Sequence, residues 1–492
     1  MPVAIAERHS PVRALAEQAF SRAAGAPLVA GNGVRLLLDA EQNYPAWLDA
    51  IRRAKRWIHF ECYIFSDDVV GREFAAALAE KARQGVRVRV LYDWLGNLGQ
   101  GTRRLAASLR AAGAEVRCFN PPRLDSPFGW LRRDHRKMVA ADGAVGCVTG
   151  LCVSARWVGD SSRGIDSWRD TGVEVRGPAV AEIERAFAEV WAETGEALPA
   201  DEVPEAEDIP EAGEMAVRVV ASAPSLAGLY RLDQLIAAMA RKTLWLTDAY
   251  FVGTAAYVNG LRAAALDGVD VRLLVPGSSD VPVLRPVTTA GYRALLEAGI
   301  RVFEWNGSMM HAKTAVADGR WARVGSTNLN VSSWIGNYEL DVAVEDEGFA
   351  AEMERAYLQD LEGSTEIVLQ RGRRVRPVQP RVRASRRSRR GSASRVAAGA
   401  LRLGNTVEAA ITSRRLLGPA EARTMALGAM MLLTLAVVAA LWPQLVAFPV
   451  AALSAWVGLA LLVGARRALR RRGAGEALER RPVEEKGPLA AP

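Results

Sequence analysis

Two short stretches of this sequence share one pattern of reactive residues. DHRKMVAADG and HAKTAVADGR each place a His first, a Lys two residues later and an Asp five residues after the Lys. The chain has only 4 His, and Lys supplies just six of its 63 basic residues, so the repeated use of both types indicates chemistry rather than surface charge. The six residues of the two motifs are His135, Lys137, Asp142, His311, Lys313 and Asp318, and we predict all of them to be catalytic.

The spacing of His and Lys fits a strand that presents both side chains on one face. Alternate residues of a strand point the same way, and the apolar residues after Lys137 predict such a strand. A neutral imidazole can attack phosphorus or hold a proton near neutral pH, and a Lys ammonium is a compact charge suited to a phosphate oxygen. The other two histidines, His9 and His59, lie outside the pattern and are interpreted as ordinary structural residues.

Polar residues after the second motif add hydrogen-bond donors and a carboxylate. The stretch GRWARVGSTNLN supplies the hydroxyl of Ser326 and the amide of Asn328. NYELDVAV then places Glu339 on a predicted strand, where it could orient His311 as a carboxylate orients imidazole in hydrolytic triads.

The first half carries a related but altered set. Gly150 and Cys152 stand at the places of the serine and the asparagine, and Asp170 aligns with the glutamate. Two His, two Lys, two orienting acids and a donor cluster predict a site for a tetrahedral anion that uses no metal or cofactor. No further cluster of His, Cys or acids in the sequence suggests a cation site.

The two halves of the sequence repeat each other beyond these motifs. IRRAKRWIHFECYIF (51–65) resembles IAAMARKTLWLTDAYF (236–251), and VRVRVLYD (86–93) parallels VDVRLLVP (269–276). Helices that alternate with short strands predict an α/β class, with one sheet in each half. We therefore expect a duplicated, two-lobed fold with two matching sites.

Differences in composition divide the 492 residues into segments. The net charge is +8, but eleven Arg and no acid fall between Arg371 and Arg395, which leaves the rest of the chain at −3 and argues against general nucleic-acid binding. The predicted segments are an N-terminal extension without a cleavable signal (1–30), the first lobe (31–200), an acidic, solvated linker (201–214), the second lobe (215–370), an Arg-rich juxtamembrane segment (371–423), two transmembrane helices (424–465) and a cytoplasmic tail (466–492).

Two apolar runs near the C-terminus predict a membrane hairpin. Thr424–Trp442 and Leu445–Ala465 are uncharged runs of 19 and 21 residues, close to the ~20 that cross a bilayer as helix. A buried hairpin of a soluble domain is the alternative, but neither run has a polar face. Arg residues flank the pair on both sides, which predicts a multi-pass protein of the bacterial inner membrane whose catalytic region lies on the cytoplasmic side.

The doubled HxKxxxxDG pattern, with GSTN after the second copy, resembles the phospholipase D superfamily. YPAWLDAIRRAKRWIHFECYIFSDD, NPPRLDSPFGWLRRDHRK and WRDTGVEVRGPAV resemble its bacterial cardiolipin synthase branch, over roughly Val34 to Gly363. The resemblance implies two lobes, each a sheet between helices, with both motifs meeting at their interface. The sequence departs from the family pattern in two places. Cys152 stands where the family has Asn, and the predicted membrane hairpin is C-terminal, whereas some cardiolipin synthases carry an N-terminal hairpin.

The same resemblance implies a metal-free, two-step reaction. One His attacks a phosphodiester to form phosphohistidine, the other protonates the leaving alcohol, and a second alcohol then displaces the enzyme. Family analogy makes His135 the nucleophile and assigns stabilisation of the pentacoordinate phosphorus to the Lys pair and Asn328.

Three classes of function follow from these features. The leading one is a phosphatidyltransferase that makes cardiolipin or a related phospholipid from phosphatidylglycerol, or another phosphatidyl donor, at an anionic membrane surface. A phosphodiesterase that hydrolyses phospholipid, or less readily nucleic acid, is the alternative, although the near-neutral catalytic region lacks the basic surface that nucleic acid needs. A membrane scaffold with an inactive site is the third, and two complete motifs argue against it.

Overall fold

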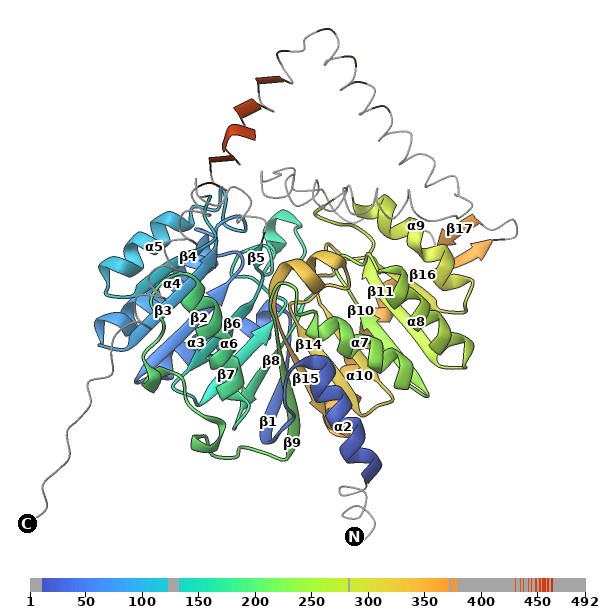
Figure 1. The fold of residues 1–492 in the computed structure, drawn as a ribbon, viewed down its shortest axis with the longest axis horizontal. Coiled ribbons are helices and arrows are strands. Elements are labelled where there is room, and N and C mark those ends of the chain that lie inside the picture. Colours follow the sequence, from blue (N-terminus) through green and yellow to red (C-terminus); the bar gives the residue numbers. More distant parts are fainter. Residues whose placement is uncertain are drawn as a thin grey trace, which may run out of the picture. The chain divides into compact units, whose positions relative to one another are not determined.

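The computed structural model describes residues 11–122, 132–281, 284–370 and 374–377, together with scattered positions between 430 and 462. The chain divides into a large unit, Met1–Asn120 with Arg132–Ala422, and a second unit made of Pro121–Leu131 and Arg423–Pro492. All that follows on fold and site concerns the large unit, in which two sheets with their helices form two lobes (Figure 1).

The first lobe is built on one mixed sheet. Its strands are β1 (Val29–Leu38), β2 (Trp57–Cys62), β3 (Arg87–Asp93), β4 (Glu115–Phe119), β6 (Lys137–Ala141), β7 (Val145–Thr149) and β8 (Thr171–Arg176). They lie in the order β4-β3-β2-β6-β7-β8-β1. The pairs among β4, β3 and β2 are parallel, and the remaining pairs are antiparallel.

The second lobe repeats this order strand for strand. Its strands are β9 (Met215–Ser222), β10 (Thr243–Thr247), β11 (Asp270–Pro276), β12 (Arg301–Trp305), β13 (Thr314–Ala317), β14 (Trp321–Gly325) and β15 (Asn337–Glu345). They lie in the order β12-β11-β10-β13-β14-β15-β9, and β16 (Ser364–Gln370) and β17 (Arg374–Pro377) extend the sheet beyond β12. The predicted duplicated α/β fold is therefore confirmed.

Helices cover both sheets at equivalent places in the two lobes. In the first lobe they are α3 (Asp39–Arg53), α4 (Val69–Arg83), α5 (Thr102–Ala111) and α6 (Val180–Glu193), and in the second α7 (Gly228–Met239), α8 (Ala255–Leu266), α9 (Leu284–Leu296) and α10 (Glu347–Glu362), with α2 (Pro11–Ala24) preceding β1. Helix α3 buries Tyr44, Trp47, Leu48 and Ile51, the 3.6-residue stripe of an amphipathic helix. Asp68 caps the start of the neighbouring helix α4, and its carboxylate accepts hydrogen bonds from the backbone N–H groups of Val70 and Gly71.

One apolar core crosses the boundary between the lobes. It contains Phe187 and Trp191 of α6, Phe349 and Met353 of α10, and inward residues of both sheets. A second cluster fills the space under α3, α4 and α5, and a third the space under α7, α8 and α9. Because the middle core is shared, the strands that carry the two motifs are held in one rigid frame.

The segment between the lobes differs from the solvated linker that its acids predict. Most of its acids are exposed, but Glu202 is fully buried against the first lobe. Its carboxylate accepts from Arg89 at 2.7 and 3.0 Å, and His59 lies 3.5 Å from it. The histidine that the sequence marks as ordinary thus helps to fasten this segment.

The predicted transmembrane runs fall largely outside the described residues. The positions that are described between 430 and 462 are helical, and several of them expose apolar side chains, among them Met430, Leu441 and Phe448. Within the part of the chain that the structure describes, no helix is long and apolar enough to cross a bilayer. The Arg-rich segment is described only at 374–377.

Candidate active site

The two histidines sit at the same end of the central strands, and each is tied to the other lobe. A short strand β5 (Arg133–Asp134) precedes His135 and pairs in parallel with the start of β15. The backbone N–H of His135 donates to the carbonyl of Tyr338 at 2.9 Å, and that of His311 donates to the carbonyl of Arg169 at 2.7 Å. The motif of each lobe therefore lies against the acid-bearing strand of the other.

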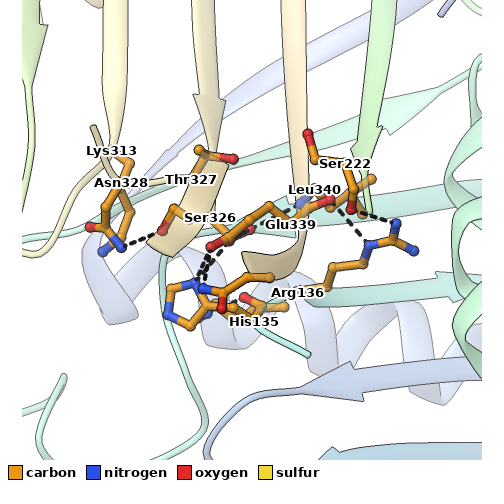
Figure 2. Close-up of polar contacts among 12 residues, drawn as sticks. His135, Arg136, Ser222, Lys313, Ser326, Thr327, Asn328, Glu339 and Leu340 are labelled. Atoms are coloured by element: carbon orange, nitrogen blue, oxygen red, sulfur yellow. Dashed lines mark hydrogen bonds and ion pairs between the residues drawn. The ribbon is translucent and has the colours of Figure 1, made fainter. Parts of the chain in front are cut away.

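Glu339 holds His135 through the ring nitrogen Nδ1. The carboxylate oxygens lie 2.8 and 3.0 Å from Nδ1, and the same carboxylate accepts from Ser326 Oγ at 2.5 Å (Figure 2). It also accepts from Asn337 Nδ2 at 3.0 Å. Glu339 is fully buried. Its hydrogen bonds to these partners, and not to water, therefore hold the carboxylate in place. A carboxylate at Nδ1 favours the tautomer in which Nε2 carries a lone pair for attack.

Asp170 holds His311 in the same way. Its Oδ2 lies 2.7 Å from Nδ1 of His311 and accepts from the indole N–H of Trp157 at 2.9 Å, while Oδ1 accepts from the backbone of Thr171 at 2.9 Å. The sequence predicted that Glu339 would orient His311, and that pairing is wrong. The lobes exchange their acids, because the stretch before each histidine pairs with the opposite lobe and not with its own β8 or β15.

Lys137 and Lys313 lie beside their histidines and are fully buried. The ammonium of Lys313 is 2.9 Å from Nδ1 and 3.2 Å from Nε2 of His311, and each Lys donates to the backbone carbonyl of its own His. Burial lowers the pKa of Lys313 to about 8, an effect that the charge of Lys137 reinforces. The two Lys thus act on each other across the lobe boundary, as parts of one cationic site.

Both imidazoles are held in the neutral form. Burial away from water lowers the pKa of His135 to about 4, since the opposing charge of Glu339 does not offset it and both lysines add to it. Burial, reinforced by Lys313, lowers the pKa of His311 as well, although Asp170 opposes it. Each side chain keeps a small exposed fraction, 11% for His135 and 7% for His311, so a ligand can reach the pair.

The hydrogen-bond donors predicted from the sequence have different roles in the structure. Ser326 serves Glu339, as described above. Asn328 is 1% exposed; its Nδ2 lies 3.5 Å from Ser333 Oγ, and its Oδ1 has no hydrogen-bond partner among the described residues. Cys152 occupies the equivalent place in the first lobe, where burial would raise its pKa but a hydrogen bond from Cys62 and the charge of Lys137 lower it.

The structure does not bring the two motif aspartates to the histidines. Asp142 lies beyond the far end of β6, where its carboxylate accepts from the backbone N–H groups of Lys55, Arg56 and Trp57 at 2.7 to 2.9 Å. Asp318 makes the same bonds to residues 241–243 beyond the far end of β13, at 2.7 to 3.1 Å. The catalytic role predicted for both is corrected to a structural one: each fixes the start of the neighbouring strand, β2 or β10.

Arg136 is a site residue that the sequence did not single out. It is fully buried, and it donates from Nε to the carbonyl of Glu339 at 3.1 Å and from Nη2 to the carbonyl of Ser222 at 3.2 Å (Figure 2). A third bond reaches the carbonyl of Ala186 in α6. The Arg136 guanidinium therefore connects the first motif to the strand end that carries Glu339. In the sequence, the only sign of this role is the position of Arg136 between His135 and Lys137.

Aromatic rings pack against both imidazoles, one against His135 and three against His311. The ring centroid of Tyr63 lies 4.8 Å from that of His135, and the centroids of Trp157, Trp168 and Tyr250 lie 5.3 to 5.8 Å from that of His311. Apolar ring atoms near the imidazoles lower the local dielectric, which strengthens the charge interactions of the site. The sequence repeat contained a signal for two of them, since each copy ends its first strand near a Tyr.

The comparisons with known proteins agree with this geometry. The sequence profile described as "Cardiolipin synthase, PLD-like domain" matches residues 47–191 and 233–361. Cardiolipin synthase A of Pseudomonas fluorescens (strain SBW25) is 34% identical over 72% of this chain and 73% of its own, and cardiolipin synthase A of Pseudomonas aeruginosa (strain LESB58) is 35% identical over 74% of each.

A solved structure shares the fold at much lower sequence similarity. Phosphatidylserine synthase of Haemophilus influenzae Rd KW20 superposes with a TM-score of 0.56 at 12% identity, over 80% of this chain and 97% of that one. The duplicated lobes, the paired His-Lys motifs and these relatives together confirm the resemblance that the motifs predicted. The chain belongs to the phospholipase D superfamily, in its cardiolipin synthase-like branch.

Proposed function

We propose that this protein is a phosphatidyltransferase that makes cardiolipin, or a closely related phospholipid, through a phosphohistidine intermediate. The observation that carries the proposal is the pair of neutral histidines, each held at Nδ1 by a buried acid from the other lobe and each with a buried lysine beside it. The relatives named cardiolipin synthase A support the same reaction class.

In the first half-reaction the phosphodiester of a donor such as phosphatidylglycerol binds between the two lysines. Nε2 of His135 attacks phosphorus, and the bond from phosphorus to the headgroup oxygen breaks. The bound anion raises the pKa of His311 above its value in the empty site, so His311 can carry the proton that the leaving glycerol takes. Lys137, Lys313 and Asn328 stabilise the pentacoordinate phosphorus.

In the second half-reaction the terminal hydroxyl of an acceptor approaches the phosphohistidine. His311 now takes the proton of that hydroxyl, the new oxygen–phosphorus bond forms, and the bond to His135 breaks. Glu339 stabilises the positive charge that His135 carries while it is phosphorylated. When the acceptor is a second phosphatidylglycerol the product is cardiolipin, and when it is water the product is phosphatidic acid.

We also propose that the enzyme is anchored to the bacterial inner membrane. The apolar runs 424–442 and 445–465, the exposed apolar side chains at described positions within them, and the Arg-rich segment before them support an anchor beside anionic lipid. Each Arg near such a surface contributes about 1 kcal/mol. Single cysteines introduced at Gln444 and Gly473 and labelled from either side test the topology, and labelling of Gly473 from the periplasm would contradict it.

The chemical proposal is tested with purified full-length enzyme and defined phospholipids. Mass spectrometry of the products should show cardiolipin-like species from phosphatidylglycerol. His135→Ala and His311→Ala should each lower turnover by about a thousandfold or more, because the two residues act as one unit. Retention of more than a tenth of wild-type turnover by either variant would contradict the paired mechanism, and phosphatidic acid as the sole product would favour the hydrolase.

A further inference from the structure

The two half-sites differ at the position two residues before each catalytic histidine. The first lobe has Arg133 there, and the second lobe has Met309. Met309 is buried in a small apolar cluster with Ala249, Tyr250 and Val281. Because the duplicated fold accepts an apolar residue at this place, the buried guanidinium of the first lobe is not a requirement of the fold.

Arg133 begins β5, and the chain stays paired with β15 as far as His135, whose backbone N–H donates to Tyr338. The neighbouring Asp134 and Arg136 turn the other way, since Arg136 bonds to helix α6 and Asp134 interacts with Glu61 beneath it. Residues that alternate along a strand share a face, so Arg133 lies on the same side as His135. The residue is 8% exposed, and its lobe-two counterpart is buried too.

The guanidinium of Arg133 is oriented but only partly bonded. Its Nη1 donates to Asp93 Oδ1 at 3.1 Å, and Asp93 is itself held by the backbone N–H groups of Gly96 and Asp134. Among the described residues, Nε and Nη2 of Arg133 have no hydrogen-bond partner. A buried donor without a partner is costly to leave in the folded state, which indicates that a ligand or water completes it.

We propose that Arg133 binds the phosphate of the acceptor lipid, an inference that rests on the proposed transferase function. Two parallel N–H groups of a guanidinium match two oxygens of a phosphate. The Cα atoms of residues two apart in an extended segment lie about 6.7 Å apart, a span of the same order as that between the terminal hydroxyl of phosphatidylglycerol and its own phosphate. The acceptor can therefore present its hydroxyl to the phosphohistidine while its phosphate lies on Arg133.

The second half-site suits a different part of the substrate. Met309 and Val281 pack in one buried apolar cluster with Tyr250, whose ring lies beside His311, and Trp168 packs against this cluster. A charged phosphate would lose its hydration there without gaining a partner. The asymmetry thus assigns the acceptor phosphate to the first lobe, and it makes Arg133 the residue that distinguishes a glycerophosphate acceptor from a plain alcohol.

A partition experiment tests the assignment without depending on the first half-reaction. Full-length enzyme in mixed micelles receives phosphatidylglycerol together with deuterated glycerol, so both acceptors compete for one phosphatidyl-enzyme. Cardiolipin and deuterated phosphatidylglycerol are then measured by mass spectrometry, and their ratio is compared between wild type and Arg133→Gln. We expect the ratio to fall by roughly tenfold to a hundredfold, the range for loss of hydrogen bonds to a charged group.

The matched control is Arg132→Gln, which removes a half-exposed guanidinium from the neighbouring position. An unchanged ratio in Arg133→Gln would overturn the proposal even if total turnover fell, because the residue would then serve the donor or the fold. An equal fall in Arg132→Gln would overturn it as well. Absence of both products from the wild type would refute the proposed transferase function, and this inference with it.

A second measurement needs no variant and so does not depend on folding. Wild-type enzyme is offered glycerol phosphate and glycerol at equal concentrations. Neither acceptor has acyl chains, so neither is concentrated in the micelle. We expect glycerol phosphate to be used at least tenfold faster. Equal use of the two acceptors would overturn the role of Arg133.

Discussion

Glu339→Gln should slow the enzyme by about a thousandfold while leaving its fold intact. The substitution keeps the size of the side chain and an oxygen that can accept the Nδ1 proton of His135. Ser326 can still donate to that oxygen, so the side chain keeps a partner at its place. What is lost is the negative charge that stabilises His135 when it becomes positively charged.

The magnitude follows from the short separation of the two groups. With Nδ1 and Oε2 2.8 Å apart, the centres of charge lie about 4 Å apart, which corresponds to about 4 kcal/mol at an effective dielectric constant near 20. Each ~1.4 kcal/mol in the barrier changes the rate tenfold. The loss of this charge therefore predicts a fall of about three orders of magnitude in kcat.

The assay is rapid-quench formation of the phosphoenzyme from phosphatidylglycerol, followed by peptide mapping of the labelled histidine. Asp341→Asn is the matched control, because Asp341 is a buried carboxylate two residues along the same strand that binds Arg323 at 2.9 Å instead of a histidine. We expect that control to lose stability but to keep most of its rate per folded molecule. A rate for Glu339→Gln within tenfold of wild type, or an equal loss in the control, would refute the crossed pairing.

Three further outcomes are expected. Asp142→Ala should lower the unfolding temperature through the loss of bonds to three backbone N–H groups, with turnover per folded molecule changed only a few-fold; a thousandfold loss would restore its catalytic role. Burial lowers the pKa of His135 to about 4, so kcat/KM should fall on acidification only well below pH 6.5. The Glu339 carboxylate raises the pKa of His135, so this fall should move to still lower pH in Glu339→Gln. EDTA should leave turnover unchanged, since the two buried lysines supply the positive charge that a metal would. A loss of turnover that one divalent ion reverses would contradict this.

The sequence by itself predicted the reactive histidines and lysines and the duplicated architecture. His and Lys at a spacing of two lie on one side of any strand, so their shared face needs no tertiary information. Repetition of the strand and helix pattern predicted the duplicated fold, and the alignment of Asp170 with Glu339 identified both orienting acids. These inferences depend on local geometry, which short stretches of sequence encode.

The tertiary structure decided which acid serves which histidine. Glu339 follows His311 in the sequence yet binds His135, because β5 crosses to pair with β15 of the other lobe. The motif spacing likewise could not show that Asp142 ends up beyond the far end of β6 from His135, where it binds the backbone of residues 55–57. Contacts between lobes arise from the packing of two surfaces distant in the chain, and no periodicity along the sequence records them.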